Sequence, residues 1–144
     1  MNKKAEQWQS FLTENKITCF SVEEMNNEIN TVVYRAFLEI KGQKLPTMLV
    51  VDDSIYGMLQ VRVAEALVTE DNKTAVLTYI NELNKKYKVF KYYVGDKGDL
   101  CLDSCMPSTG EGFDPNIVHA VIDVVLKHLN DEYPVLMRKI WATE

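Results

Sequence analysis

The stretch from Asn72 to Asp103 constrains the fold more than any other part of the chain, because its hydrophobic period changes there from helical to strand-like. In the first half, apolar side chains recur at spacings of three and four and polar residues fill the other face. The recurring residues are Val76, Ile80, Leu83 and Tyr87, with Leu77 beside them. This spacing predicts an amphipathic helix in which Leu83 packs against a sheet. Lysines gather at its end, where the helix dipole favours positive charge.

From Val89 onward the period is two, as in a β-strand. Two alternating runs follow each other, separated by the turn sequence GDKGD; they carry Phe90, Tyr92 and Val94, then Leu100, Leu102, Ser104 and Met106. Gly95 and Gly98 in that turn can adopt positive φ at little steric cost. The stretch therefore predicts a helix that leads directly into an antiparallel hairpin.

The preceding residues predict one helix and three strands. Apolar spacing places the helix at about Lys3 to Asn15 and the strands at about Thr31 to Ile40, Leu45 to Val51 and Met58 to Val68. The second strand is almost continuously apolar, so we expect it inside the sheet, with Pro46 among its first residues. Gln60 and Arg62 alternate with apolar residues, which predicts one wet face on the third strand. Residues 21–30 are polar and are interpreted as a connection.

The last helix begins with Asp114 as N-cap and Pro115 at its first position. Pro134 predicts a kink, or a fresh start at Tyr133. The apolar sector of this helix is wider than one sheet face covers. One flank is expected to face the sheet, and a second flank needs another cover; the first comprises Val118, Ile122, Val125 and Leu129, and the second Ile117, Val121 and Val124. Either the first helix, through Trp8, or a second copy of the chain in a homodimer could supply that cover.

These elements predict a single α+β domain over residues 1–144, with the order α-β-β-β-α-β-β-α and a five-stranded antiparallel sheet packed by helices. A net charge of −5 argues against general binding to nucleic acid or to anionic membranes. The N-terminus lacks the apolar core of a signal peptide, and no window approaches the length of a membrane span. The odd number of cysteines, three, argues against a disulfide framework. A cytoplasmic protein is expected.

The element order, together with NELNKKYKVFKYYVGDKGDLCLDSCMP and HLNDEYPVLMRKIW, resembles the YbjN family of proposed bacterial sensory transduction regulators. Leu83 and Asn84 match the family's LN-type helix end, and Gly98 and Asp99 match its Gly-Asp turn. The family's fold is similar to that of type III secretion chaperones, small acidic proteins that commonly dimerise and hold an extended segment of a client. The resemblance implies this architecture and transfers no catalytic residue.

Three residue groups could carry chemistry, and each has a simpler interpretation. Cys101, Asp103 and Cys105 share one face of a strand, but residues four apart there lie roughly 13 Å apart, too far to chelate one zinc ion or form a disulfide. His119 and Asp123 are four residues apart on a helix and could contact each other, but they lie on its polar stripe, which is the position of ordinary solvent-exposed residues. The KKYKVFKYY cluster mixes cations and aromatics as single-strand binders do, yet it also fits lysines at a helix end followed by strand aromatics.

No P-loop, dinucleotide fingerprint, nucleophile elbow or HExxH motif occurs in the chain. We therefore predict no catalytic residue, no cofactor and no metal site. The favoured function is a non-catalytic protein-interaction module, a chaperone-like or regulatory adaptor with a protein partner. A small-ligand-sensing domain is the alternative, and an undescribed enzyme is less favoured. The predicted interaction residues are Ile117, Val121 and Val124.

Overall fold

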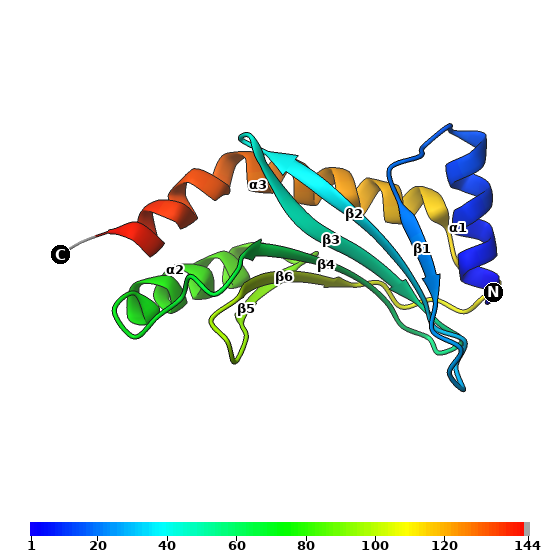
Figure 1. The fold of residues 1–144 in the computed structure, drawn as a ribbon, viewed down its shortest axis with the longest axis horizontal. Coiled ribbons are helices and arrows are strands. Elements are labelled where there is room, and N and C mark those ends of the chain that lie inside the picture. The colour runs from blue at the N-terminus through cyan, green and yellow to red at the C-terminus, as the bar shows by residue number, and fades with distance from the viewer. Residues whose placement is uncertain (143–144) are drawn as a thin grey trace.

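The computed structural model describes residues 1–142 and contains three helices and a six-stranded antiparallel sheet (Figure 1). The helices are α1 (Lys3–Glu14), α2 (Lys73–Lys86) and α3 (Pro115–Trp141). The strands are β1 (Ser21–Glu24), β2 (Val32–Ile40), β3 (Gln43–Val51), β4 (Gly57–Ala64), β5 (Lys91–Val94) and β6 (Leu100–Cys105), in the spatial order β1-β2-β3-β4-β6-β5. The α+β class is confirmed. Of the predicted domain, residues 143–144 lie outside the described part.

The sheet has six strands rather than the predicted five because β1 forms within residues 21–30. The prediction of a connection there is wrong for this short segment, which pairs with residues 32–35 of β2 at the edge of the sheet. All four β1 side chains are exposed, so the sequence has no alternation between buried and exposed residues that would reveal a strand. Backbone pairing, which leaves no mark in the sequence, defines β1.

The helix and hairpin predicted between Asn72 and Asp103 are confirmed as α2, β5 and β6. Leu83 is buried, whereas Leu77 faces outward. The side chain of Asn84 joins the helix to β5: its Oδ1 accepts from Tyr92 N at 2.7 Å and its Nδ2 donates to Tyr92 O at 3.1 Å. Gly98 has a φ of +84°, and a Cβ there would collide with the Val68 carbonyl. The backbone geometry therefore requires a glycine at position 98, and the two backbone hydrogen bonds to Tyr92 explain the asparagine at position 84.

The third predicted strand is shorter than expected. Strand β4 ends at Ala64 instead of Val68, after an irregularity in its pairing with β6 and before Ala66, whose φ is +53°. Pro46 is the fourth residue of β3 and lies just beyond Thr47, the last β3 residue paired with β4. Its missing amide therefore removes no bond to β4. Strand β3 lies inside the sheet, as predicted.

Helix α3 begins as predicted, because the Asp114 side chain accepts a hydrogen bond from Asn116 N and Pro115 occupies the first position. It continues through Pro134 without a fresh start at Tyr133, and Figure 1 shows it bending in its C-terminal part. Leu136 is 1% exposed, so burial beyond the proline stabilises the last turns and offsets the lost backbone bond.

All three helices pack against the same face of the sheet. The larger core cluster joins α2 and the buried face of α3, from Val121 to Ile140, to the sheet. The smaller cluster joins Trp8 and Leu12 of α1 to β2, β3 and the start of α3. Val121 belongs to the larger cluster and is 8% exposed, so the expectation that it points away from the core is wrong. Both α2 and the sheet contact α3, which explains its wide apolar sector. Val118, Val125 and Leu129 are buried as predicted.

Candidate functional site

The opposite face of the sheet has no helix against it in the described part of the chain and is called the open face below. One row of residues crosses all six strands on this face in consecutive register; it consists of Ser21, Arg35, Met48, Gln60, Asp103 and Lys91. Phe37 and Pro46 are partners in the next row, which also contains Arg62. The open face therefore mixes cationic, amide and exposed apolar side chains.

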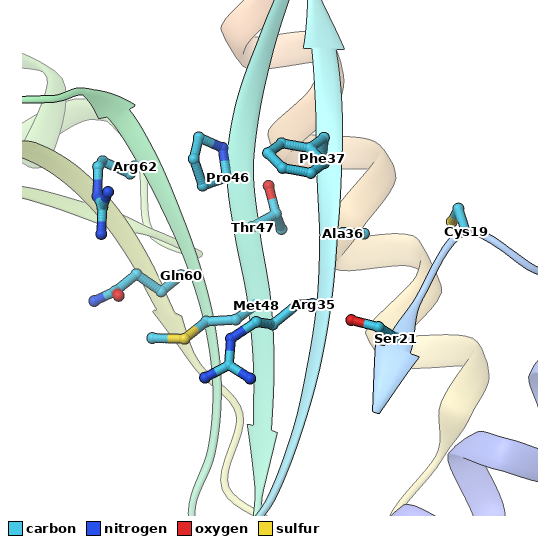
Figure 2. A pocket seen from close by; sticks show the side chains of 10 residues that line it. All are labelled: Cys19, Ser21, Arg35, Ala36, Phe37, Pro46, Thr47, Met48, Gln60 and Arg62. Atoms are coloured by element: carbon cyan, nitrogen blue, oxygen red, sulfur yellow. The ribbon is translucent and has the colours of Figure 1, made fainter. Parts of the chain in front are cut away.

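A half-open groove of about 500 Å³ lies on the open face between the end of β1 and β4 (Figure 2). It is lined by Cys19, Ser21, Arg35, Ala36, Phe37, Pro46, Thr47, Met48, Gln60 and Arg62. The floor is apolar: Phe37 is 64% exposed and lies beside Pro46, with Met48 in the adjacent row. Pairing between β3 and β4 ends at Thr47, and Figure 1 shows the two strands diverging beyond this point. The groove extends across this point, because the paired residues Met48 and Gln60 line it together with Pro46 and Arg62.

The charged residues that line the groove are Arg35, which extends from β2 beside Met48, and Arg62 on β4. The Arg35 guanidinium pairs with Glu23 Oε1 at 2.5 Å. Arg62 has longer contacts, with 3.5 Å to Glu65 Oε1 and 3.9 Å to Asp99 Oδ2. Both arginines are about half exposed, so their guanidinium groups are accessible from the groove.

The outer edge of β2 continues past the groove without a partner strand. Strand β1 covers residues 32–35 of β2, and Cys19, two residues before β1 begins, lies outside the sheet. Residues 36–40 make no backbone hydrogen bond on that side within residues 1–142. At roughly 3.3 Å per residue this free edge is about 16 Å long. It offers unpaired N–H and C=O groups to an added strand.

Most of the chain matches the model of one protein family. The model of a family described as "Putative bacterial sensory transduction regulator" matches residues 10–137. The chain belongs to the YbjN family. The match extends from α1 into the last turns of α3 and includes every strand, as the sequence resemblance implied. No curated protein matches the chain. Among the described residues, no helix is both long and apolar enough to span a membrane.

In this YbjN-family chain a polar cluster on the open face borders the groove and shares Gln60 with it. Gln60 donates to the Tyr93 hydroxyl at 2.8 Å, and Asp103 lies between Gln60 and Lys91 in the row. Burial raises the pKa of the Asp103 carboxyl. One of its oxygens, Oδ1, has no hydrogen-bond partner within residues 1–142. Neither this cluster nor any other described part groups three potential metal ligands.

The cysteines are free thiols in the described structure: Cys101 is buried, while Cys19 and Cys105 are exposed. We expect Cys105→Ser to change the free energy of unfolding by less than about 0.5 kcal/mol. Cys101→Ser should cost about 1–3 kcal/mol, because a hydroxyl replaces a buried thiol. Urea denaturation of both variants checks these values. Stoichiometric zinc in the purified protein, lost in the double variant, would contradict the prediction of no metal site.

The predicted interaction residues on α3 do not form one surface. Ile117 and Val124 are 58% and 47% exposed, respectively, whereas Val121 is buried. Nearby, His119 Nδ1 lies 3.7 Å from Asp123 Oδ2, with both side chains exposed, as a solvated surface pair. The ring of Phe11 in α1 lies 5.6 Å from that of His119, so α1 borders this flank of the helix within the same chain.

Three aromatics of the KKYKVFKYY cluster, Tyr87, Phe90 and Tyr92, pack inward around His128, a residue that the sequence analysis did not single out. The fourth, Tyr93, is exposed on the open face. Rings of Tyr87 and Phe90 lie 4.6 and 4.3 Å from the His128 ring, and the Tyr92 hydroxyl is 2.7 Å from His128 Nε2. Lys91 Nζ donates to two carbonyls at the end of α2. His128 follows Val125 by three residues on the buried stripe of α3, so the helical spacing could have revealed it.

Burial lowers the pKa of His128, and burial also raises that of Tyr92. Both shifts fit a neutral imidazole that accepts the Tyr92 O–H at Nε2. Charges on neighbouring elements act in both directions, because Glu132 and Asp131 raise the His128 pKa and Lys86 lowers it. Desolvation is the largest of these effects, so the folded protein favours the uncharged ring.

This shift predicts a loss of stability in mild acid. As the pH falls below about 6.5, the unfolded chain protonates this histidine before the folded protein does. The contribution of the neutral His128 ring to the free energy of unfolding is therefore complete above about pH 6.5. It decreases as the pH falls toward the lowered pKa of the folded state, by at most about 1.4 kcal/mol per pH unit. Urea midpoints between pH 7.5 and 5 should fall less steeply for His128→Gln than for the wild type. His119→Gln is the control, and an unchanged slope in His128→Gln would contradict the assignment.

Proposed function

We propose that this YbjN-family chain is a non-catalytic protein-interaction module that acts as an adaptor or regulator and binds an extended segment of its partner at the groove. The observation that carries the proposal is an exposed apolar floor, centred on Phe37, next to an unpaired strand edge. The family is described as a regulator rather than as an enzyme. Free thiols are typical of the reducing cytoplasm, where we place the protein.

The energetics of the groove favour a partner. Full burial of an exposed side chain such as phenylalanine contributes roughly 1.5–3 kcal/mol. Phe37 is 64% exposed and would gain much of this on binding, whereas Met48 is already partly buried and would gain less. The outer edge of β2, residues 36–40, has unpaired main-chain groups that can form hydrogen bonds with the part of the bound segment that extends past the groove on the β1 side. Together these features match the way in which sheet domains bind extended peptides.

A small-ligand sensor is the second candidate, supported by the size of the groove. Its volume of about 500 Å³ lies within the range of roughly 300–1,000 Å³ of ligand sites. Such sites usually enclose most of the ligand, however, whereas this groove is half open along the sheet. The protein-binding function is therefore the better supported of the two.

Affinity purification from the native organism with quantitative mass spectrometry tests the proposal. The variant Phe37→Ser/Met48→Ser should lose at least about 90% of the specific partner, since two apolar contacts are removed. Trp141→Ser is the matched control, because Trp141 is an aromatic residue with the same exposed fraction, 64%, on α3. Equal recovery of all partners by the groove variant and the control would falsify the proposed surface.

We also propose a homodimer, with Ile117 and Val124 on its interface, since both are exposed apolar residues on one helix. Sedimentation equilibrium at high micromolar concentration should give about twice the 16.5 kDa chain mass. Ile117→Glu/Val124→Glu should restore the monomer, because the interface would bury unpaired carboxylates. Leu77→Glu on α2 is the control. A wild-type monomer at these concentrations would exclude the dimer. Val121→Glu is unsuitable as a test because this buried change would also disturb the core.

A further inference from the structure

The groove differs in charge from the protein as a whole. The chain has a net charge of −5, yet the charged residues among those lining the groove are both arginines, Arg35 and Arg62. The remaining arginine, Arg138, lies on α3. The acidic neighbours of these arginines, Glu23, Glu65 and Asp99, do not line the groove, so the groove lining itself presents positive charge beside an apolar floor, which a partner could recognise.

Both guanidinium groups can bind the carboxylate of a partner. Arg35 is paired with Glu23, but both side chains are half exposed, and such surface pairs contribute little and exchange easily. The contacts of Arg62 are 3.5 and 3.9 Å long, beyond the distances of strong hydrogen bonds. Each guanidinium has five N–H donors arranged to bind a carboxylate in a bidentate manner.

The spacing of the two arginines suggests the pattern of the bound segment. Arg35 and Gln60 lie in one row with Met48 between them, and Arg62 is two residues beyond Gln60 on β4. With strands about 4.8 Å apart and a rise of roughly 3.3 Å per residue, the backbone positions of Arg35 and Arg62 are separated by at least roughly 12 Å, because β3 and β4 are no longer paired at Arg62. In an extended peptide, residues four apart are separated by roughly 13 Å and point to the same side.

We propose that the groove binds an acidic, extended peptide segment with carboxylates at positions i and i+4 and a bulky apolar side chain at i+2. The carboxylates would pair with Arg35 and Arg62, and the apolar residue would lie on Phe37, Pro46 and Met48. This inference rests on the proposed function and specifies the chemistry of its partner. A peptide fits better than a small acid because the groove is half open and extends from Cys19 to β4.

Fluorescence anisotropy with two labelled twelve-residue peptides tests this inference on the full chain. One carries glutamates at i and i+4 around a leucine at i+2, with serine and threonine elsewhere; the other has lysines in place of the glutamates. The glutamate peptide should bind at least about 10-fold more tightly than the lysine peptide in 50 mM salt, and the ratio should decrease in 500 mM salt. Equal affinity, tighter binding of the lysine peptide, or no binding would overturn the inference.

Arg35→Gln/Arg62→Gln should weaken binding of the glutamate peptide at least about 10-fold. The control Lys127→Gln/Arg138→Gln removes the same charge from exposed positions on α3 and should retain the binding. Equal losses in the two double variants would show a non-specific charge effect and overturn the inference. Efficient competition by decanoate, an apolar carboxylate without a peptide backbone, would instead assign the groove to small acids.

The two proposals can fail separately. If the peptides do not discriminate by charge while Phe37→Ser/Met48→Ser still loses its cellular partner, the acidic pattern is wrong and the interaction surface stands. If that apolar variant keeps every partner, the interaction surface itself is wrong. Both exposed arginines lie outside the core, so thermal unfolding of their variants should remain close to that of the wild type.

Discussion

Trp8→Ala is expected to lower the free energy of unfolding by about 3–5 kcal/mol, the usual cost of truncating a buried tryptophan. The ring is fully buried in the smaller core cluster; it stacks on Phe11 at 5.3 Å and meets Phe20 edge-on at 5.8 Å. Its Nε1 has no hydrogen-bond partner within residues 1–142, so the expected loss comes from packing. Urea denaturation followed by circular dichroism measures it.

The chain contains a natural control for this measurement. Its second tryptophan, Trp141, is 64% exposed at the end of α3, and Trp141→Ala should change the stability by less than about 0.5 kcal/mol. Similar midpoints for the two variants would show that α1 does not pack on the sheet as described. Trp8→Phe, which keeps most of the apolar volume, should recover part of the loss.

Leu83→Ala is expected to cost about 2–5 kcal/mol. Leu83 lies on α2 between the helix and the sheet and is 5% exposed within the larger core cluster. Truncation leaves a cavity where α2 meets the hairpin, a junction that Asn84 holds through two hydrogen bonds to Tyr92. The urea midpoint measures this loss, and the slope of the unfolding transition should be the same in the variant and the wild type.

Leu77→Ala is the matched control for Leu83→Ala, because it makes the same substitution on the exposed side of α2. It should cost less than about 0.5 kcal/mol. Should the two leucine variants unfold at the same urea concentration, the orientation of α2 would have to be revised.

The interaction surface was only partly predictable. The alternation of Gln60 and Arg62 with apolar residues correctly indicated a wet face on β4. The groove was missed, because it depends on where pairing between β3 and β4 ends and on where β1 leaves the edge of β2. Both are contacts between distant segments, and neither changes the local hydrophobic period.

The apolar sector of α3 shows the same limit. Its width correctly predicted a second contact for the helix, but the sequence could not assign that contact to α2, to α1 or to another chain. In the structure α2 and the sheet both contact α3, which places Val121 in the core and leaves Ile117 and Val124 exposed. A hydrophobic side chain requires burial without specifying its neighbour.

By itself, the sequence determined the α2–β5–β6 unit, the start of α3 at Asp114 and Pro115, and the buried face of most elements. These features depend on residues a few positions apart, because they follow from the period of the apolar residues, from helix capping and from turn chemistry. The tertiary structure alone decided that β1 is a strand, that α3 continues through Pro134, and that one face of the sheet has no helix against it. Those outcomes depend on how distant segments pair and compete for the same surface, and local periodicity carries no information about that competition.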